Sequence, residues 1–99
     1  MFLEKTIAVV VPCYNEEIYI RKVIETMPDF VDKIIIVDDM SSDHTVEIVE
    51  EYISTKKNRA VLIQHKVNQG VGGAIASGYI WCRDNEMDVT VVMAGDAQM

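Results

Sequence analysis

The run Ile34-Ile35-Ile36-Val37-Asp38-Asp39 decides the fold of this chain. Its first four residues are β-branched and do not alternate with polar residues, which is typical of a parallel strand covered on both faces. Three further short apolar runs share this character, and the runs start about 27 residues apart, which leaves room each time for one crossover helix. They cover residues 7–11, 60–63 and 89–93.

The segments between these runs carry the periodicity of helices. Apolar residues at spacings of three and four predict a helix over 20–27, and Pro28 ends it. The stripe of Val46, Val49 and Ile53 predicts a second helix, with Ser42 or Asp43 as its N-cap.

A third helix is expected to begin near residue 72, and its small residues would let it lie close to the sheet as ordinary core packing. They recur at intervals of four and are Ala74, Gly78 and Cys82. With right-handed crossovers, the β-α-β-α-β-α-β series predicts a three-layer α/β/α fold: an open, Rossmann-like parallel sheet of strand order 3-2-1-4. The run 89–93 would then form an open edge, through which we expect a dimer to be able to form.

The composition limits which binding partners and which cellular compartment are expected for this chain. The 99 residues are enough for one domain, and 49% hydrophobic with 25% charged residues is ordinary for a folded protein. A net charge of −7 argues against nucleic acid and anionic lipid as direct partners. The chain contains only two cysteines, Cys13 and Cys82, which fits a reducing compartment. Because no apolar stretch approaches the ~20 residues of a membrane span either, we expect a cytoplasmic location.

The loop after the first strand offers groups suited to a nucleotide. Pro12 stiffens its start, Tyr14 has a flat face for a base, and Glu16 is an acceptor for a ribose hydroxyl or a base N–H. The loop contains no glycine, which counts against a dinucleotide-dependent oxidoreductase on the same half-fold. A proline turn with a surface aromatic and first-turn carboxylates explains this loop equally well.

The loop after the second strand begins with Val37 and two adjacent carboxylates. Asp38 and Asp39 repel each other unless donors or cations satisfy them, and together they could bind the N–H edge of a pyrimidine and a ribose hydroxyl. The alternative is a capping cluster for the next helix, for which both residues sit too early in the chain.

The loop after the fourth strand carries a candidate metal ligand. Asp96, with the flexible Gly95 beside it, suits Mg²⁺ or Mn²⁺, which take one or two carboxylates together with substrate phosphates. The glycine-rich stretch 68–73 is mostly explained by a tight turn into the third helix, and contact with a sugar or phosphate is the alternative. His44 and His65 have no partner at metal-ligand spacing, so both are expected at the surface.

Taken in order, these segments resemble the family 2 glycosyltransferases of the GT-A fold, in particular the dolichyl-phosphate and other polyprenyl-phosphate glycosyltransferases. The likeness covers essentially the whole chain. Residues 10–17 match the opening motif of apolar strand, Pro, Tyr, Asn and Glu, residues 36–45 match the aspartate pair with its polar turn and Thr, and residues 68–78 match the glycine-containing segment.

The resemblance implies roles for the matching positions. Pro12, Tyr14 and Glu16 would border the nucleotide, and Val37 and Asp39 would contact its base and ribose. Asp96 falls on the second aspartate of the D-x-D motif, which binds the metal bridging the diphosphate, and Gln98 on the glutamine that commonly follows. Ala94 replaces the first aspartate of that motif, so one carboxylate is missing.

The resemblance also implies a function that this chain carries only in part. Residues 1–99 would be the donor-binding half of a GT-A domain, truncated after the D-x-D-like loop, with no catalytic residue of its own and no activity alone. The longer enzyme would transfer a sugar from a UDP- or GDP-linked donor to a polyprenyl phosphate or glycan, at the cytoplasmic face of a membrane. The alternative is a non-catalytic nucleotide-binding or assembly module.

Overall fold

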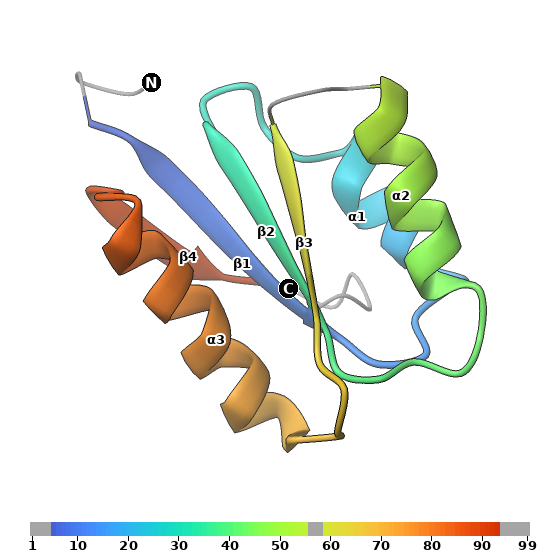
Figure 1. Cartoon of the computed structure of the whole chain (residues 1–99). Helices are drawn as coiled ribbons and strands as arrows, with labels where there is room; N and C mark the ends of the chain where they lie inside the picture. The colour runs from blue at the N-terminus through green and yellow to red at the C-terminus, as the bar shows by residue number, and fades with distance from the viewer. Residues whose placement is uncertain (1–4, 56–58, 94–99) are drawn as a thin grey trace.

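The computed structural model describes residues 5–55 and 59–93 and shows one parallel sheet with helices on both faces (Figure 1). The sheet has the strand order β3-β2-β1-β4, and every neighbouring pair is parallel. Both findings confirm the predicted architecture. In chain order the elements are β1 (Ile7–Cys13), α1 (Ile20–Glu25), β2 (Lys33–Asp38), α2 (Thr45–Thr55), β3 (Ala60–Gln64), α3 (Gly70–Asp84) and β4 (Val89–Val92).

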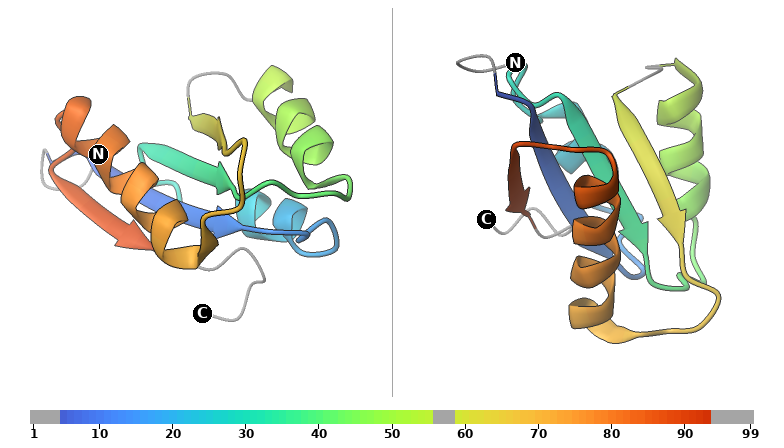
Figure 2. Two further views of the ribbon diagram at one scale, coloured as in Figure 1. Left: turned by 60° about the horizontal axis from the view of Figure 1, so that its bottom comes forward. Right: turned by 60° about the vertical axis from the view of Figure 1, so that its left-hand side comes forward.

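The unbroken apolar runs are explained by two separate cores. Alternate residues of β1 and β2, such as Val9 and Ile36, pack with α1 and α2 on one face of the sheet. The residues between them, such as Val10 and Ile35, pack under α3 on the other face. Figure 2 shows α3 alone on its side of the sheet, opposite α1 and α2. A strand buried on both faces has no polar side to alternate with.

The small residues of α3 set its distance from the sheet. Ala74, Gly78 and Cys82 are its buried residues, as their spacing predicted. A Cβ built on Gly78 would lie 2.4 Å from Cγ1 of Val10, far inside ordinary contact. The helix therefore lies closer to β1 than any side chain at this position would allow.

Three helix details differ from the sequence-based expectation. The first helix ends at Glu25 rather than near residue 27, although Met27 remains buried. In α2 the buried stripe begins at Thr45 and continues through Ile48 and Tyr52, so Val46 lies beside it rather than in it. The third helix begins at Gly70, two residues early.

The strand β4 forms one edge of the sheet. It pairs with β1 on one side, and no described residue pairs with its other side. Its Val89 and Val91 are 39% and 48% exposed, on the face of the sheet that α1 and α2 cover elsewhere. In the part of the chain that the structure describes, no helix is long and apolar enough to cross a bilayer.

Candidate functional site

The loops that follow β1 and β2 are joined to each other at the carboxyl edge of the sheet. The Asn15 amide donates to Oγ of Ser41 at 2.9 Å, and the Ser42 amide donates to Oδ1 of Asn15 at 2.8 Å. The Glu16 amide donates to Oγ1 of Thr45, the first residue of α2, at 2.9 Å. Backbone groups that a loop would leave unpaired are thus satisfied by the neighbouring loop.

Asp43 fixes the start of α2 and also holds the first loop. Its Oδ1 accepts the amide of Thr45 at 2.9 Å, which confirms it as a cap, and its Oδ2 accepts the amide of Glu17 at 3.2 Å. Burial raises the pKa of Asp43, but the hydrogen bonds from Thr45 and Glu17 outweigh that effect and leave its pKa below the ordinary value. Asp43 therefore stays ionised at neutral pH.

Asp38, at the end of β2, closes the turn that follows it. It is 2% exposed, and its Oδ2 accepts the amide of Ser41 at 3.0 Å while its Oδ1 accepts the Ser41 hydroxyl. The thiol of Cys13 lies 4.0 Å from the same carboxylate. Burial, with the charge of Asp38 adding to it, raises the pKa of Cys13 to about 12, so this cysteine remains a neutral thiol.

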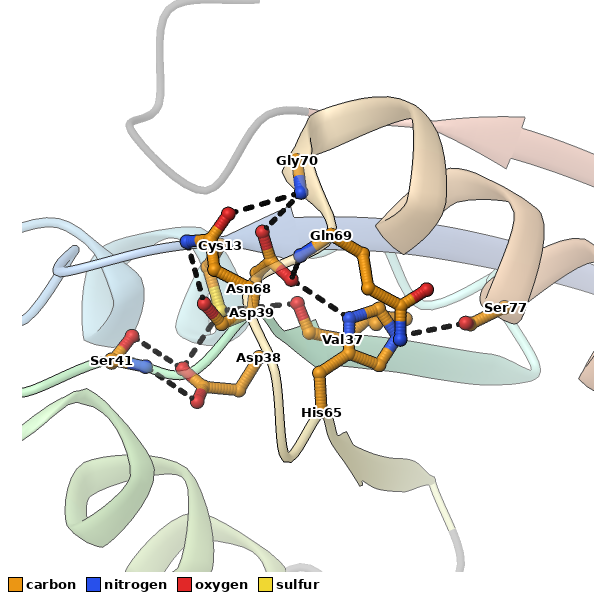
Figure 3. A network of polar contacts seen from close by, with 10 residues as sticks. All are labelled: Cys13, Val37, Asp38, Asp39, Ser41, His65, Asn68, Gln69, Gly70 and Ser77. Carbon is orange, nitrogen blue, oxygen red and sulfur yellow. Dashed lines mark hydrogen bonds and ion pairs between the residues drawn. The ribbon is translucent and has the colours of Figure 1, made fainter.

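Asp39 connects the end of β2 to the start of α3 (Figure 3). The amide of Gln69 and Nδ1 of His65 both lie 2.8 Å from its Oδ1, and the amide of Gly70 lies 2.8 Å from its Oδ2. Burial raises the pKa of Asp39, but these donors together leave its pKa below the ordinary value. The side chain is an anion held in a nest of N–H groups, and it does not cap α2.

His65 contradicts the expectation that both histidines lie at the surface. Its side chain is only 6% exposed, and its Nε2 lies 2.8 Å from Oγ of Ser77 on α3. His44 does lie at the surface, where its contact with Glu47 raises its pKa. The sequence held one clue, because His65 directly follows β3, whose carboxyl end faces the same edge as that of β2.

The glycine-rich stretch turns around Asp39. Gly70 has φ +78°, a left-handed conformation that favours glycine, and its amide also contacts Oδ1 of Asn68 at 3.1 Å. The Asn68 side chain donates in turn to the backbone carbonyl of Asp39 at 3.2 Å. The tight turn into α3 predicted from the sequence is present, and its position is fixed by Asp39.

The remaining candidate residues divide between this edge and the undescribed end of the chain. Pro12 and Val37 are neighbours across β1 and β2 and are buried, whereas Tyr14 is 49% exposed beyond the end of β1. Gly95, Asp96 and Gln98, including the predicted metal ligand, lie outside the described residues. Within residues 5–55 and 59–93, no group of three or more potential metal ligands is found.

The carboxyl edge of this parallel sheet carries one exposed aromatic residue, Tyr14, and the buried carboxylates of Asp38 and Asp39. In open α/β sheets, ligands bind at this edge. A nucleotide fits these groups chemically, because a base stacks on an aromatic ring and a carboxylate accepts its N–H groups.

Comparison with known proteins places this geometry in a family. A curated relative, the UDP-N-acetylglucosamine–dolichyl-phosphate N-acetylglucosaminyltransferase of Methanococcus voltae, is 34% identical over 96% of this chain, which spans 43% of that enzyme's length. The structure of Staphylococcus aureus TarS with UDP is 28% identical and superposes with a TM-score of 0.72, covering 92% of this chain and 27% of that one.

A third protein shares the fold at lower sequence identity. The mannosyltransferase PcManGT of Pyrobaculum calidifontis, solved with GDP-Man and Mn²⁺, superposes with a TM-score of 0.83 at 21% identity, covering 96% of this chain and 28% of that one. The model of the family described as glycosyl transferase family 2 matches residues 8–99. The motifs, the strand order and this match together show that the chain belongs to glycosyl transferase family 2.

Proposed function

We propose that this chain binds the nucleotide-sugar donor of a glycosyltransferase. The observation that carries the proposal is the joining of the β1, β2 and β3 loops around the buried Asp39, at the edge where such sheets bind ligands. The Methanococcus relative, whose name includes a UDP-linked sugar, supports a nucleotide diphosphate as the ligand. Uracil and guanine are both candidate bases, because the structure of PcManGT, which has the same fold, holds GDP-Man.

In the proposed donor site, the described loops would bind the nucleoside and the last residues of the chain would bind the diphosphate. Tyr14 would stack on the base, Asp39 would accept a base N–H, and Glu16 would accept a ribose hydroxyl. Pro12, Val37 and Asp38 would shape the floor beneath the nucleoside. Gly95, Asp96 and Gln98 would lie along the diphosphate.

Mg²⁺ or Mn²⁺ is the proposed cofactor, with Asp96 as its protein ligand. The carboxylates of the described site fit a metal poorly, because Asp38, Asp39 and Asp43 each accept hydrogen bonds at both oxygens. The oxygens of Asp96 and Gln98 are the hard ligands that these ions prefer. A bound divalent ion would offset the negative charge that develops on the leaving diphosphate.

We further propose that the acceptor, a polyprenyl phosphate or a glycan, is bound by a part of the enzyme that these 99 residues do not include. The chain spans less than half of the length of the Methanococcus enzyme, which leaves room for an acceptor-binding part elsewhere in the enzyme. The chain alone is then expected to bind donor without turnover, and the whole enzyme is expected to act at the cytoplasmic face of a membrane.

Calorimetric titration of the chain with UDP and GDP, each with and without Mn²⁺, tests the proposal. Binding of either nucleotide that strengthens with Mn²⁺ is the expected result. A folded chain that binds neither would contradict a donor site in this segment.

A non-catalytic module is the second candidate, favoured by Ala94 at the place of a metal-binding aspartate. Restoring the missing carboxylate with Ala94→Asp separates the two. For a donor site that uses metal, this variant should increase the strengthening by Mn²⁺. If nucleotide binds tightly and neither Mn²⁺ nor the substitution changes it, the non-catalytic module is favoured.

A further inference from the structure

Among the described residues, the backbone has a positive φ at three residues other than glycine, and the fold accounts for two of them. The three are Asn15, Met40 and Glu86. Glu86 follows the end of α3, where the Met87 amide donates to the carbonyl of Cys82 at 2.9 Å, as in a Schellman motif. Asn15 is of a residue type that tolerates this conformation, and its side chain accepts an amide of the neighbouring loop at 2.8 Å. Neither explanation applies to Met40.

Met40 has this conformation because it lies in the turn that Asp38 closes. Its φ is +68°, and the Asp38 carboxylate accepts both the amide and the hydroxyl of the next residue, Ser41. For a residue with a Cβ, the left-handed conformation costs about fivefold or more in the folding equilibrium constant, a cost that glycine avoids. The side chain of Met40 is 54% exposed, so the described residues bury only part of it.

Met40 lies beside Tyr14 at the carboxyl edge of the sheet. The residues on either side of Met40 are hydrogen-bonded to the residues on either side of Tyr14, which places these two residues in the middle of two joined segments. The two bonds, each of 2.9 Å, join Asp39 to Cys13 and Ser41 to Asn15. Tyr14 is 49% exposed, so two large side chains leave the sheet at the same place, with much of their surface open to a ligand.

We propose that Met40 is a further nucleotide-binding residue, whose side chain covers the base of the donor together with Tyr14. The inference rests on the proposed function, since it requires a nucleotide at this edge. Residues in costly backbone conformations cluster at ligand sites. A thioether side chain is apolar, polarisable and flexible, so it packs against a flat ring and adapts to uracil and guanine alike. Met40 should therefore add affinity for both bases.

The substitution Met40→Gly separates a binding role from a structural role, because the two roles predict different results. Glycine removes the backbone cost, so urea unfolding should give a midpoint no lower than that of the unmodified chain. The same substitution removes the apolar contact with the base. Calorimetric titration in the presence of Mn²⁺ should therefore show about fivefold weaker binding of both UDP and GDP.

Two further substitutions control for a looser loop. Met40→Ala and Met40→Leu both keep a Cβ and the same backbone constraint, and they differ only in the apolar side chain. Met40→Ala should lose about as much affinity as Met40→Gly, and Met40→Leu should lose clearly less. Ile80→Ala, which removes a 50% exposed apolar side chain from α3, should leave the binding of both nucleotides unchanged.

Three results would overturn the inference while leaving the proposed function intact. One is a Met40→Gly variant that binds UDP and GDP as tightly as the unmodified chain. Another is an equal loss in Met40→Ala and Met40→Leu, because the loss would then not depend on the apolar side chain. The third is a lowered unfolding midpoint in Met40→Gly, which would show that the residue stabilises the fold. An unmodified, folded chain that binds neither nucleotide would instead contradict the donor site, and the inference with it.

Discussion

Asp39 is buried at the end of β2, yet it stays ionised because backbone amides and a histidine ring point at it. The charge of Asp39 stabilises the fold even without a ligand, because it fixes the turn into α3. The same charge is the one that the proposed nucleotide would meet. Substitutions at this residue should therefore affect stability and binding together, and the two effects have to be measured separately.

Nucleotide binding should distinguish Asp39 from Asp96. Asp39→Ala should weaken binding about tenfold or more whether or not Mn²⁺ is present, because it removes the acceptor for the base. Asp96→Ala should remove only the part of the affinity that Mn²⁺ adds, because this residue would hold the metal. Calorimetry on folded variants measures both, and equal losses would contradict this division of labour.

The depressed pKa of Asp39 predicts how stability depends on pH. Because its pKa is lower in the folded chain than in the unfolded chain, its stabilising effect is fully present above the ordinary value of 3.8. The effect is lost as the pH falls through the lower, folded-state value. The stability gap between the unmodified chain and Asp39→Asn should thus be large at neutral pH and shrink below about pH 4.

Urea unfolding of both proteins at several pH values measures this gap. Asp39→Asn is the suitable comparison because it removes the charge and keeps the size. Asp43 also has a lowered pKa and contributes its own loss in acid, which is common to both proteins and cancels in the difference. A gap that stayed constant down to pH 2 would show that the charge of Asp39 is not what stabilises the turn.

At the scale of elements, the contact between α3 and β1 holds the third layer of the fold. The helix has small residues where it faces the sheet, and its N-terminal turn is fixed by the Asp39 carboxylate. Its position is thus set at one end by polar contacts and along its length by close packing. A change in that packing should move the nest of N–H groups around Asp39.

Two glycines of α3 offer a matched pair for testing this contact. In Gly78→Ala the new Cβ would lie 2.4 Å from Val10, so the helix must shift, and stability should fall by about 1–3 kcal/mol. In Gly72→Ala the new Cβ meets nothing within 4 Å, and the better helix former should stabilise by about 0.5–1 kcal/mol. Urea unfolding compares the two, and equal effects would rule out close packing as the cause.

At the scale of the whole molecule, one flank of the sheet is covered less than the rest. The α1 and α2 layer ends before β4, which leaves Val91 half exposed next to an apolar hollow of about 280 Å³. That hollow is lined in part by Met27, Phe30 and Met93. An unpaired edge beside apolar surface is a site where strands of two chains can join.

We therefore predict that the chain forms dimers through β4 at high concentration. Sedimentation over a range of concentrations should show a shift from monomer to dimer. Val91→Lys should prevent it, because a charge beside an open edge disfavours strand pairing. Ile18→Lys, at an 80% exposed residue outside the sheet, is the control that should leave the shift unchanged. A chain that remains monomeric throughout would contradict the prediction.

The sequence by itself determined the elements and their order. Unbroken β-branched runs, small residues at four-residue spacing and right-handed crossovers are local or topological rules, so the strand order 3-2-1-4 and the close-packed face of α3 could be predicted from them. A cap at Ser42 or Asp43 followed from their place before α2, and the structure selects Asp43. The family could be recognised because its motifs fall in order at the strand ends.

Only the tertiary structure decided how the site is connected. His65 and Asp39 are 26 positions apart, and Ser77 lies a further 12 along the chain, so no local pattern marks their contacts. The sequence indicated a surface position for His65, because a single histidine in a polar stretch shows no apolar periodicity that would indicate burial. Its partners are Asp39, directly after β2, and Ser77, in the middle of α3. Only the parallel register, which sets β3 beside β2, brings His65 next to the Asp39 carboxylate.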